Sequence, residues 1–189
     1  MAGLRRLDRA DDPKQCLMPS TIEIPTALTV GETKLLQSIA AGKSVIEAGS
    51  LLGYSTVAMA RRARQVHAID PHDGYPAFAP RPTLDVFLRN IRRHGVTERV
   101  VPVVGSVLDV LPGLSADVCF LDLTGARELT QAALELALDA CPVVAVHDYA
   151  RGGCDGCTRV VDFEVRARGL RVTRVDTLVV VERSAKSGR

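Results

Sequence analysis

Short apolar runs rich in valine and isoleucine alternate with amphipathic segments along most of the chain, and this alternation limits the fold more than any other feature. Five runs are expected to be strands, at residues 44–47, 66–70, 100–104, 118–121 and 143–146. Helices are expected from Thr29 to Gly42 and at residues 55–64, 84–93, 127–140 and 158–168. Strands with little alternation between polar and apolar residues are typical of a parallel sheet that is covered on both faces. The sequence therefore predicts a doubly wound, Rossmann-like α/β fold.

At the end of the chain the alternation of strands and helices stops. Two β-type runs, at residues 170–175 and 177–182, follow each other almost directly. A connection this short permits only an antiparallel hairpin. We therefore expect seven strands, five parallel and then the hairpin. Strands and helices would occupy residues 31–183 as one domain, with an N-terminal arm at 1–30 and a disordered tail at 184–189.

Composition supports one folded domain, and the near-neutral charge points to no polyanionic partner. The chain has 189 residues, 47% of them hydrophobic, and a formal net charge of +2. It has no Trp and few other aromatic residues to stack on bases. No apolar run approaches the length of about 20 residues that spans a bilayer, and no secretory signal is visible. We expect a cytoplasmic protein that binds neither nucleic acid nor membrane.

A glycine-containing loop, Glu47-Ala48-Gly49-Ser50-Leu51-Leu52-Gly53-Tyr54-Ser55, joins the first strand to the next helix. Gly49 allows a tight turn close to a ligand, and Ser55 can cap the helix. In doubly wound sheets the ligand binds at the carboxyl ends of the strands. A glycine turn without any ligand is the structural alternative.

Further polar residues follow the second and third strands. Asp70, ahead of Pro71 and His72, can accept hydrogen bonds from the two hydroxyls of a ribose. Gly105 and Ser106, after the third strand, could meet an adenine. Asp70 could instead only cap the turn before Pro71.

The stretches "VIEAGSLLGYSTVAMAR", "IDPHDGY" and "VVAVHDYA" resemble class I S-adenosylmethionine-dependent methyltransferases, in particular the small-molecule O-methyltransferases of the caffeoyl-CoA, catechol and antibiotic-sugar groups. The resemblance implies the strand order 3-2-1-4-5-7-6 and S-adenosylmethionine as cofactor. It implies methylation of a hydroxyl on a small molecule, such as a sugar or natural product. The residues it assigns to the cofactor are Glu47, Gly49, Ser50, Gly53, Tyr54, Ser55, Asp70, Pro71, His72, Gly105, Ser106 and Asp122.

Two neighbouring strand ends carry the candidate catalytic residues Asp122, His147 and Asp148. In the metal-dependent relatives the corresponding positions bind a divalent cation, so these three residues are also the candidate ligands for Mg²⁺ or another divalent ion. His147 could instead be the general base without a metal. The residues could also be purely structural, and the sequence leaves these three alternatives open.

Five cysteines are present, and two of them, Cys154 and Cys157, form a C-x-x-C in a glycine-rich loop after the His-Asp pair. Ordinary thiols, a disulfide or redox-sensitive pair, and a metal site remain alternatives for these two cysteines.

Two other functional classes remain alternatives to the methyltransferase. One is an NAD(P)-dependent oxidoreductase, and the other is a non-catalytic methyltransferase-like binding protein. The short chain leaves little to build a substrate lid, so the acceptor pocket is either shallow or completed by another subunit, which would make the protein a homodimer.

Overall fold

A seven-stranded sheet forms the centre of the computed structural model, which describes residues 21–123, 127–150, 152 and 155–183. Its strands are β1 (Ser44–Ala48), β2 (Gln65–Asp70), β3 (Val100–Val104), β4 (Val118–Leu121), β5 (Val143–Val146), β6 (Arg171–Val175) and β7 (Leu178–Glu182). Their order across the sheet is β3-β2-β1-β4-β5-β7-β6. The pairs among β1 to β5 are parallel and both pairs of β7 are antiparallel, so the predicted order and hairpin are confirmed.

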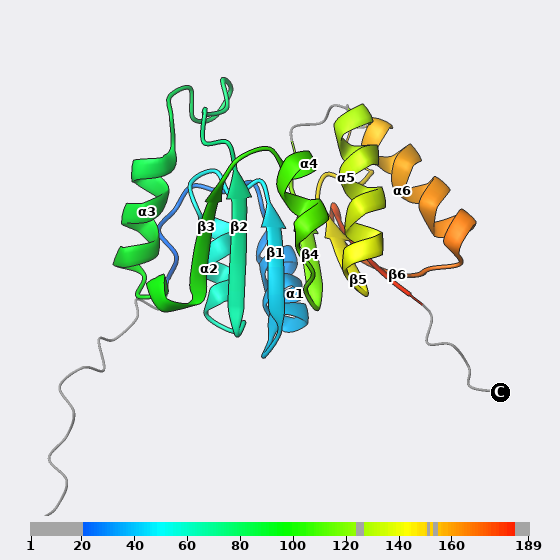
Figure 1. The fold of residues 1–189 in the computed structure, drawn as a ribbon, viewed down its shortest axis with the longest axis horizontal. Helices are drawn as coiled ribbons and strands as arrows, with labels where there is room; N and C mark the ends of the chain where they lie inside the picture. The colour runs from blue at the N-terminus through cyan, green and yellow to red at the C-terminus, as the bar shows by residue number, and fades with distance from the viewer. Residues whose placement is uncertain (1–20, 124–126, 151, 153–154, 184–189) are drawn as a thin grey trace, which may run out of the picture.

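Six α-helices surround the sheet in the described part of the chain (Figure 1). They are α1 (Val30–Ala40), α2 (Tyr54–Ala60), α3 (Leu84–Arg93), α4 (Val107–Val110), α5 (Arg127–Ala140) and α6 (Asp155–Arg168). Two single turns of 3₁₀ helix, η1 (Thr97–Arg99) and η2 (Leu111–Gly113), complete the elements. The sequence did not predict α4 or the 3₁₀ turns, because segments of three or four residues are too short for a periodic pattern.

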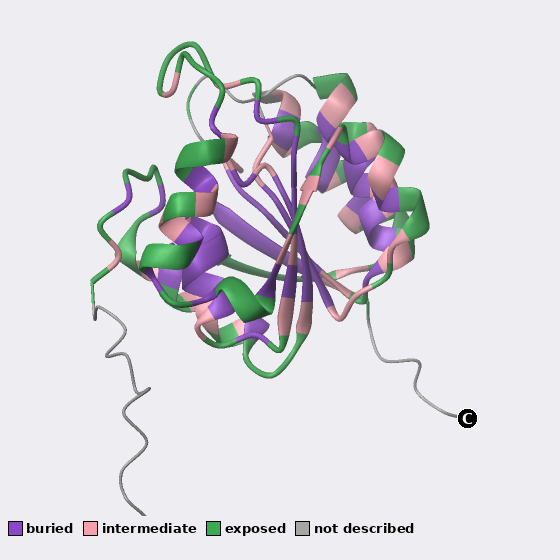
Figure 2. Ribbon diagram, turned by 60° about the vertical axis from the view of Figure 1, so that its left-hand side comes forward, coloured by how far each residue is buried: buried purple, intermediate pink, exposed green. Residues whose placement is uncertain are grey.

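Two apolar clusters lie on opposite faces of the sheet, and buried residues are seen on both sides of it in Figure 2. The first contains Leu36 of α1, Val57 of α2 and Phe87 of α3, while the second contains Leu134 of α5 and Val160 of α6. Successive strand residues alternate between the clusters, because their side chains point to opposite faces of the sheet. The central strands are consequently buried on both faces, which explains why their sequences are mainly apolar.

The N-terminal part of the described chain contributes to this core. Ile24 and Leu28 are buried in the first cluster, and α1 begins at Val30 with Thr29 as its N-cap. The predicted boundary between the N-terminal arm and the domain, at residue 30, coincides with the first residue of α1. The rest of the predicted arm, residues 1–20, and the predicted tail, residues 184–189, lie outside the described residues.

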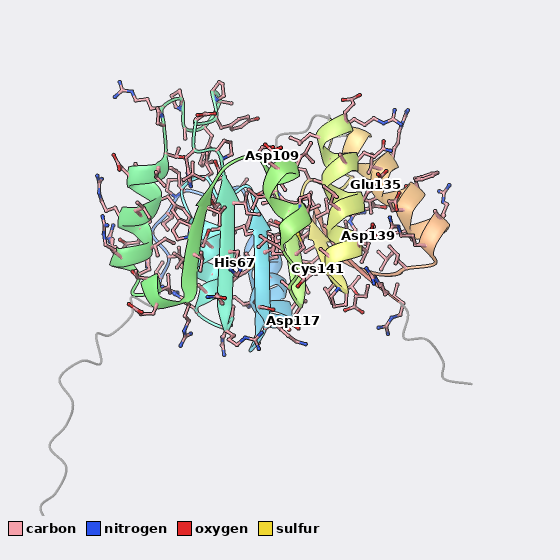
Figure 3. All side chains as sticks on the ribbon, viewed as in Figure 1. His67, Asp109, Asp117, Glu135, Asp139 and Cys141 are labelled. Carbon is pink, nitrogen blue, oxygen red and sulfur yellow. The ribbon has the colours of Figure 1, made fainter. Side chains whose placement is uncertain are left out.

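An acidic side chain at the lower edge of the sheet, where the parallel strands begin, has a structural role. Asp117, labelled there in Figure 3, accepts hydrogen bonds from the backbone N–H and the hydroxyl of Ser44, both at 2.8 Å. These bonds tie the start of β1 to the residue before β4. At the opposite edge, where the parallel strands end, several polar side chains lie close together.

Candidate functional site at the carboxyl ends of the strands

The first residues after four of the five parallel strands are aligned by the hydrogen bonding of the sheet itself. The backbone N–H of Gly49 donates to Ile69, that of Asp122 to Ala48 and that of His147 to Leu121, at 2.9, 2.9 and 3.0 Å. Gly105 donates in the same way to Asp70, at 3.2 Å. Because these bonds continue the parallel ladders by one residue, the predicted site residues that follow β1, β3, β4 and β5 meet at one edge.

The glycine loop after β1 uses backbone conformations that glycine adopts readily. Gly49 and Gly53 have φ angles of 93° and 91°. Gly53 is the N-cap of α2, and a Cβ atom there would lie 3.1 Å from the ring of Phe87. The loop is therefore a tight turn that brings its backbone close to the strand edge, as the sequence predicted.

Buried polar groups lie beneath this loop. Glu47 is fully buried and accepts hydrogen bonds from the hydroxyls of Ser55 and Thr56, while its Oε1 atom and the hydroxyl of Ser50 have no hydrogen-bond partner among the described residues. Burial raises the pKa of Glu47 to about 8, against the opposing effect of the two hydroxyl groups. A buried acceptor without a partner is costly unless a ligand or water completes it.

Tyr54 differs from its neighbours in the predicted cofactor set. Its hydroxyl lies 3.2 Å from the hydroxyl of Thr33 in α1, and its ring packs against the first apolar cluster. The hydroxyl is thus directed towards α1.

Asp70 organises the next part of the edge. Its Oδ2 atom accepts from the backbone N–H of Leu51 at 2.8 Å, and its Oδ1 atom accepts from that of His72 at 2.7 Å. Each carboxylate oxygen can accept a further hydrogen bond. Asp70 therefore joins the glycine loop to β2 and still offers acceptors to a ligand.

The side chain of His72 is buried, although Pro71 before it is exposed. The Nδ1 atom of His72 lies 2.9 Å from the hydroxyl of Thr83, and its ring lies 5.1 Å from that of Phe87. Burial lowers the pKa of His72, with Asp70 acting in the opposite direction. This histidine anchors the loop that leads to α3.

Gly105 and Ser106 lie where the sequence placed them, directly after β3. Ser106 is exposed and its hydroxyl accepts from the backbone N–H of Leu108 at 3.3 Å, which caps α4.

Asp122, His147 and Asp148 come together as predicted, with one potential ligand atom from each within 4.8 Å of the others. The Nδ1 atom of His147 lies 3.1 Å from Oδ1 of Asp122 and 3.6 Å from Oδ1 of Asp148. The side chains of Asp122 and Asp148 are 32% and 23% exposed, whereas that of His147 is only 3% exposed. The two carboxylates can therefore reach a substrate, and the imidazole lies behind them.

Electrostatics favour the charged form of this histidine. Burial alone would lower the pKa of His147, but the hydrogen bond and charge of Asp122, with the charges of Asp148 and Glu32, raise it above its usual value. The Nε2 atom of His147 lies 3.6 Å from Oε2 of Glu32, so both ring nitrogens face carboxylates. The sequence analysis missed Glu32, although the pattern T-x-x-E at residues 29–32 is a recognisable capping box.

The residues fit a divalent cation through their oxygen atoms. Asp122 and Asp148 supply carboxylates that reach solvent, which suits Mg²⁺ or Mn²⁺. His147 would have to exchange its contact with Asp122 for the metal.

Backbone conformations at this edge are unusual. Five described residues other than glycine have positive φ angles, and all lie in connections at the carboxyl ends of β1, β2, β5 and β6: Leu51, His72, Asp148, Ala150 and Asp176. Such conformations cost free energy and cluster at functional sites.

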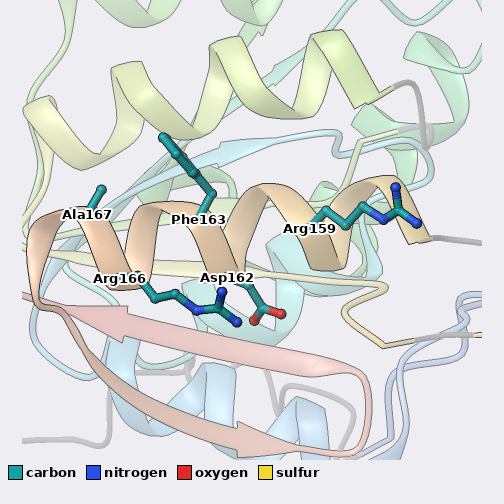
Figure 4. A pocket seen from close by; sticks show the side chains of 5 residues that line it. All are labelled: Arg159, Asp162, Phe163, Arg166 and Ala167. Carbon is teal, nitrogen blue, oxygen red and sulfur yellow. The ribbon is translucent and has the colours of Figure 1, made fainter.

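The described residues line at least two cavities. The one lined by His147 and Asp148, together with Cys157, has a volume of about 10 Å³, room for about one water molecule. A larger open groove of about 550 Å³ follows the outer side of α6 and is lined by Arg159, Asp162, Phe163, Arg166 and Ala167 (Figure 4). This groove is separate from the strand-end residues.

The C-x-x-C pair is only partly described. Cys157 is buried and its Sγ atom lies 3.4 Å from the carbonyl oxygen of His147, whereas Cys154 lies outside the described residues.

A sheet with this strand order, and with its polar residues at the ends of the parallel strands, defines the class I methyltransferase fold. A family model described as a methyltransferase domain matches residues 46–149, more than half of the chain. The chain belongs to this methyltransferase domain family.

Known relatives agree with this assignment. A catechol O-methyltransferase of Mycobacterium tuberculosis is 33% identical over 124 residues, which are 63% of this chain and 54% of that protein. The chain thus spans about half the length of this curated relative.

Solved structures show the same fold. The structure of cofactor-bound Rv0187 from MTB has a TM-score of 0.69 at 26% identity, over 85% of this chain and 84% of that one. An O-methyltransferase from Bacillus cereus in complex with SAH has a TM-score of 0.65 at 20% identity, over 82% of each chain. Within the described residues, no helix is both long and apolar enough to cross a membrane.

Proposed function

We propose that this protein is an S-adenosylmethionine-dependent O-methyltransferase that acts on a hydroxyl group of a small molecule. The observation that carries this proposal is the alignment of the glycine loop, Asp70, Gly105 and Asp122 along one edge of the sheet. The likeness to the catechol O-methyltransferase supports the reaction class. Membership of the methyltransferase family sets aside the NAD(P)-dependent alternative.

The cofactor would lie across this edge. Asp70 would accept hydrogen bonds from the ribose, Gly105 and Ser106 would meet the adenine, and the loop from Gly49 to Gly53 would contact the methionine part. Glu47, with its buried and unpartnered Oε1 atom, is suited to the ammonium group of the methionine. We assign Tyr54 and His72 a supporting role, because their polar groups contact Thr33 and Thr83.

In the reaction, the acceptor oxygen attacks the methyl carbon, the bond from carbon to sulfur breaks, and its electron pair stays on sulfur. The cofactor already activates the methyl group, so the protein has to align the reactants and remove the hydroxyl proton. Asp122 and Asp148 are the residues suited to face the acceptor, because they are the partly exposed members of the cluster.

A divalent cation held by Asp122 and Asp148 is the proposed means of deprotonation. When bound, it would lower the pKa of the acceptor hydroxyl, so that the proton could pass to solvent water at this partly exposed edge. A base role for His147 is less well supported, because its side chain is almost completely buried and both ring nitrogens face carboxylates.

The acceptor needs more space than the cavity at His147 and Asp148 offers. We therefore propose that further walls come from a second copy of the chain, with residues 31–183 as the methyltransferase domain of each copy. Light scattering at micromolar concentration tests this, and a monomer with full activity would refute it.

Calorimetric titration with S-adenosylhomocysteine is the direct test of the cofactor. We expect a dissociation constant in the micromolar range, and folded protein that gives no heat would refute the proposal. A screen of catechols, sugars and other hydroxyl compounds, read as release of S-adenosylhomocysteine, then tests transfer. Binding of the cofactor product without turnover of any acceptor would support the non-catalytic alternative.

A further inference from the structure

Glu32 is a fully buried carboxylate that lies outside every predicted set of site residues. It belongs to the first turn of α1, where it forms a capping box with Thr29: the hydroxyl of Thr29 accepts from the backbone N–H of Glu32 at 3.1 Å, and Oε2 of Glu32 accepts from that of Thr29 at 2.8 Å. This part of its role is that of an ordinary helix cap.

A second set of contacts joins Glu32 to the turn of the terminal hairpin. Its Oε1 atom accepts from the backbone N–H and the hydroxyl of Thr177, at 2.8 and 2.7 Å. The hairpin turn is also attached to the site, because the backbone N–H of Tyr149 donates to the carbonyl of Thr177 at 2.9 Å. The carboxylate of Glu32 is thus held from two sides and cannot reorient freely.

His147 lies on the third side of this carboxylate. Its Nε2 atom is buried without a hydrogen bond and lies 3.6 Å from Oε2 of Glu32, while Nδ1 lies 3.1 Å from Oδ1 of Asp122. A ring turned about its Cβ–Cγ bond would place carbon atoms against one or both carboxylates and lose these contacts. Glu32 therefore favours one orientation of the imidazole over the other.

We propose that Glu32 is a positioning residue of the candidate active site, which holds the His147 ring with Nε2 towards α1 and Nδ1 towards Asp122. In this orientation the ring fixes the Asp122 carboxylate at the edge where the cofactor and acceptor would meet. A carboxylate in the outer shell that orients a histidine is a recurrent device in enzyme sites. The value of this orientation for catalysis rests on the proposed methyltransferase function.

The test observes the ring directly, in the full chain without cofactor. Protein with ¹⁵N-labelled histidine is examined by long-range ¹H–¹⁵N correlation spectroscopy, and the His147→Asn variant assigns the signals of His147. In wild type we expect ring N–H signals of His147 that are protected from exchange with water. In Glu32→Gln, which keeps the shape of the side chain, we expect these signals to be lost or shifted, with those of His67, His72 and His94 unchanged.

Two matched variants separate positioning from capping. Thr29→Ala removes the hydroxyl half of the capping box, and Thr177→Ala removes one hydrogen bond to Oε1, but both leave the carboxylate facing His147. We expect both to lower the melting temperature and to keep the His147 signals. Loss of those signals in the two threonine variants, or their retention in Glu32→Gln and Glu32→Ala, would overturn the proposal.

The same samples distinguish this proposal from the proposed function. If wild type binds S-adenosylhomocysteine and the His147 signals persist in Glu32→Gln, only the positioning role fails. If folded wild type does not bind it and the signals depend on Glu32, the orientation of the ring is upheld and the proposed function fails.

Discussion

The carbonyl oxygen of Asp122 occupies the space in which a side chain at Gly49 would begin. A Cβ atom built on Gly49 would overlap this oxygen, and it would lie 2.9 Å from the carbonyl carbon of the same residue. The close approach follows from the parallel pairing of β1 with β4, since the residues after these strands lie side by side. The turn of the glycine loop and the first catalytic candidate are therefore coupled through the backbone.

Gly49→Ala should be more destabilising than its backbone strain alone predicts. A φ angle of 93° costs an alanine about 1–3 kcal/mol, and the overlap with Asp122 adds to this. Gly42→Ala is the matched control, because Gly42 also has a positive φ angle, of 70°, but no atom lies within 4 Å of its Cβ position. Chemical denaturation measures the free energy of unfolding of both variants. Equal decreases in the two variants would contradict the close approach of Gly49 to Asp122.

Glu47→Gln should stabilise the cofactor-free protein increasingly as pH rises. In the unfolded chain this carboxyl ionises near its ordinary pKa of 4.5, whereas burial raises its pKa to about 8 in the folded state. Between these two pH values the free energy of unfolding of the wild-type protein falls by about 1.4 kcal/mol for each pH unit. The amide of Glu47→Gln does not ionise, so the variant lacks this loss. Below pH 4.5 both states are protonated and the two proteins should respond alike to pH.

The comparison requires denaturation curves of wild type and Glu47→Gln between pH 4 and about 8.5. The exposed Glu128→Gln is a suitable control, which we expect to follow wild type. A difference between Glu47→Gln and wild type that does not change with pH would show that Glu47 is ionised in the folded protein.

Asp70→Asn should weaken the binding of S-adenosylhomocysteine by roughly tenfold to a hundredfold, the cost of losing hydrogen bonds to a charged acceptor. Stability should fall as well, because an amide cannot accept from both Leu51 and His72. Asp73→Asn alters an exposed acid of the same connection and should leave affinity unchanged. Calorimetry at a temperature where both variants are folded gives the comparison, and equal affinities would argue against the ribose contact.

Mn²⁺ should bind to the wild-type protein and be displaced by EDTA. Replacement of either partly exposed carboxylate of the cluster, in Asp122→Asn or Asp148→Asn, should weaken this binding at least tenfold, because each removes a charged oxygen ligand. Asp109→Asn changes an exposed acid in α4 and serves as the control. Electron paramagnetic resonance of free Mn²⁺ measures the affinity, and binding that survives both substitutions would place the ion elsewhere.

The fold could be predicted from the sequence because the strands and the hairpin are each indicated by a short segment of the chain. Uniformly apolar runs at β4 and β5 predict strands that are buried on both faces, and the two residues between β6 and β7 permit only a hairpin. The positions of Gly49, Asp122 and His147 followed from the same reasoning, since residues after neighbouring parallel strands must meet at one edge. The short helix α4 gave no periodic signal.

The chemistry of individual side chains depended on packing between distant segments. The sequence made His147 a candidate base, but its burial and its contact with Glu32 arise because α1 packs beside the terminal hairpin, where Glu32 and Thr177 are 145 positions apart. The contacts of the Tyr54 hydroxyl with Thr33 and of the His72 ring with Thr83 likewise arise only in the folded chain. By itself the sequence determined the layered sheet and the edge at which the polar residues gather, because residue spacing governs strand pairing. Only the tertiary structure decided which of those residues reach solvent, because burial is set by whatever packs around a side chain.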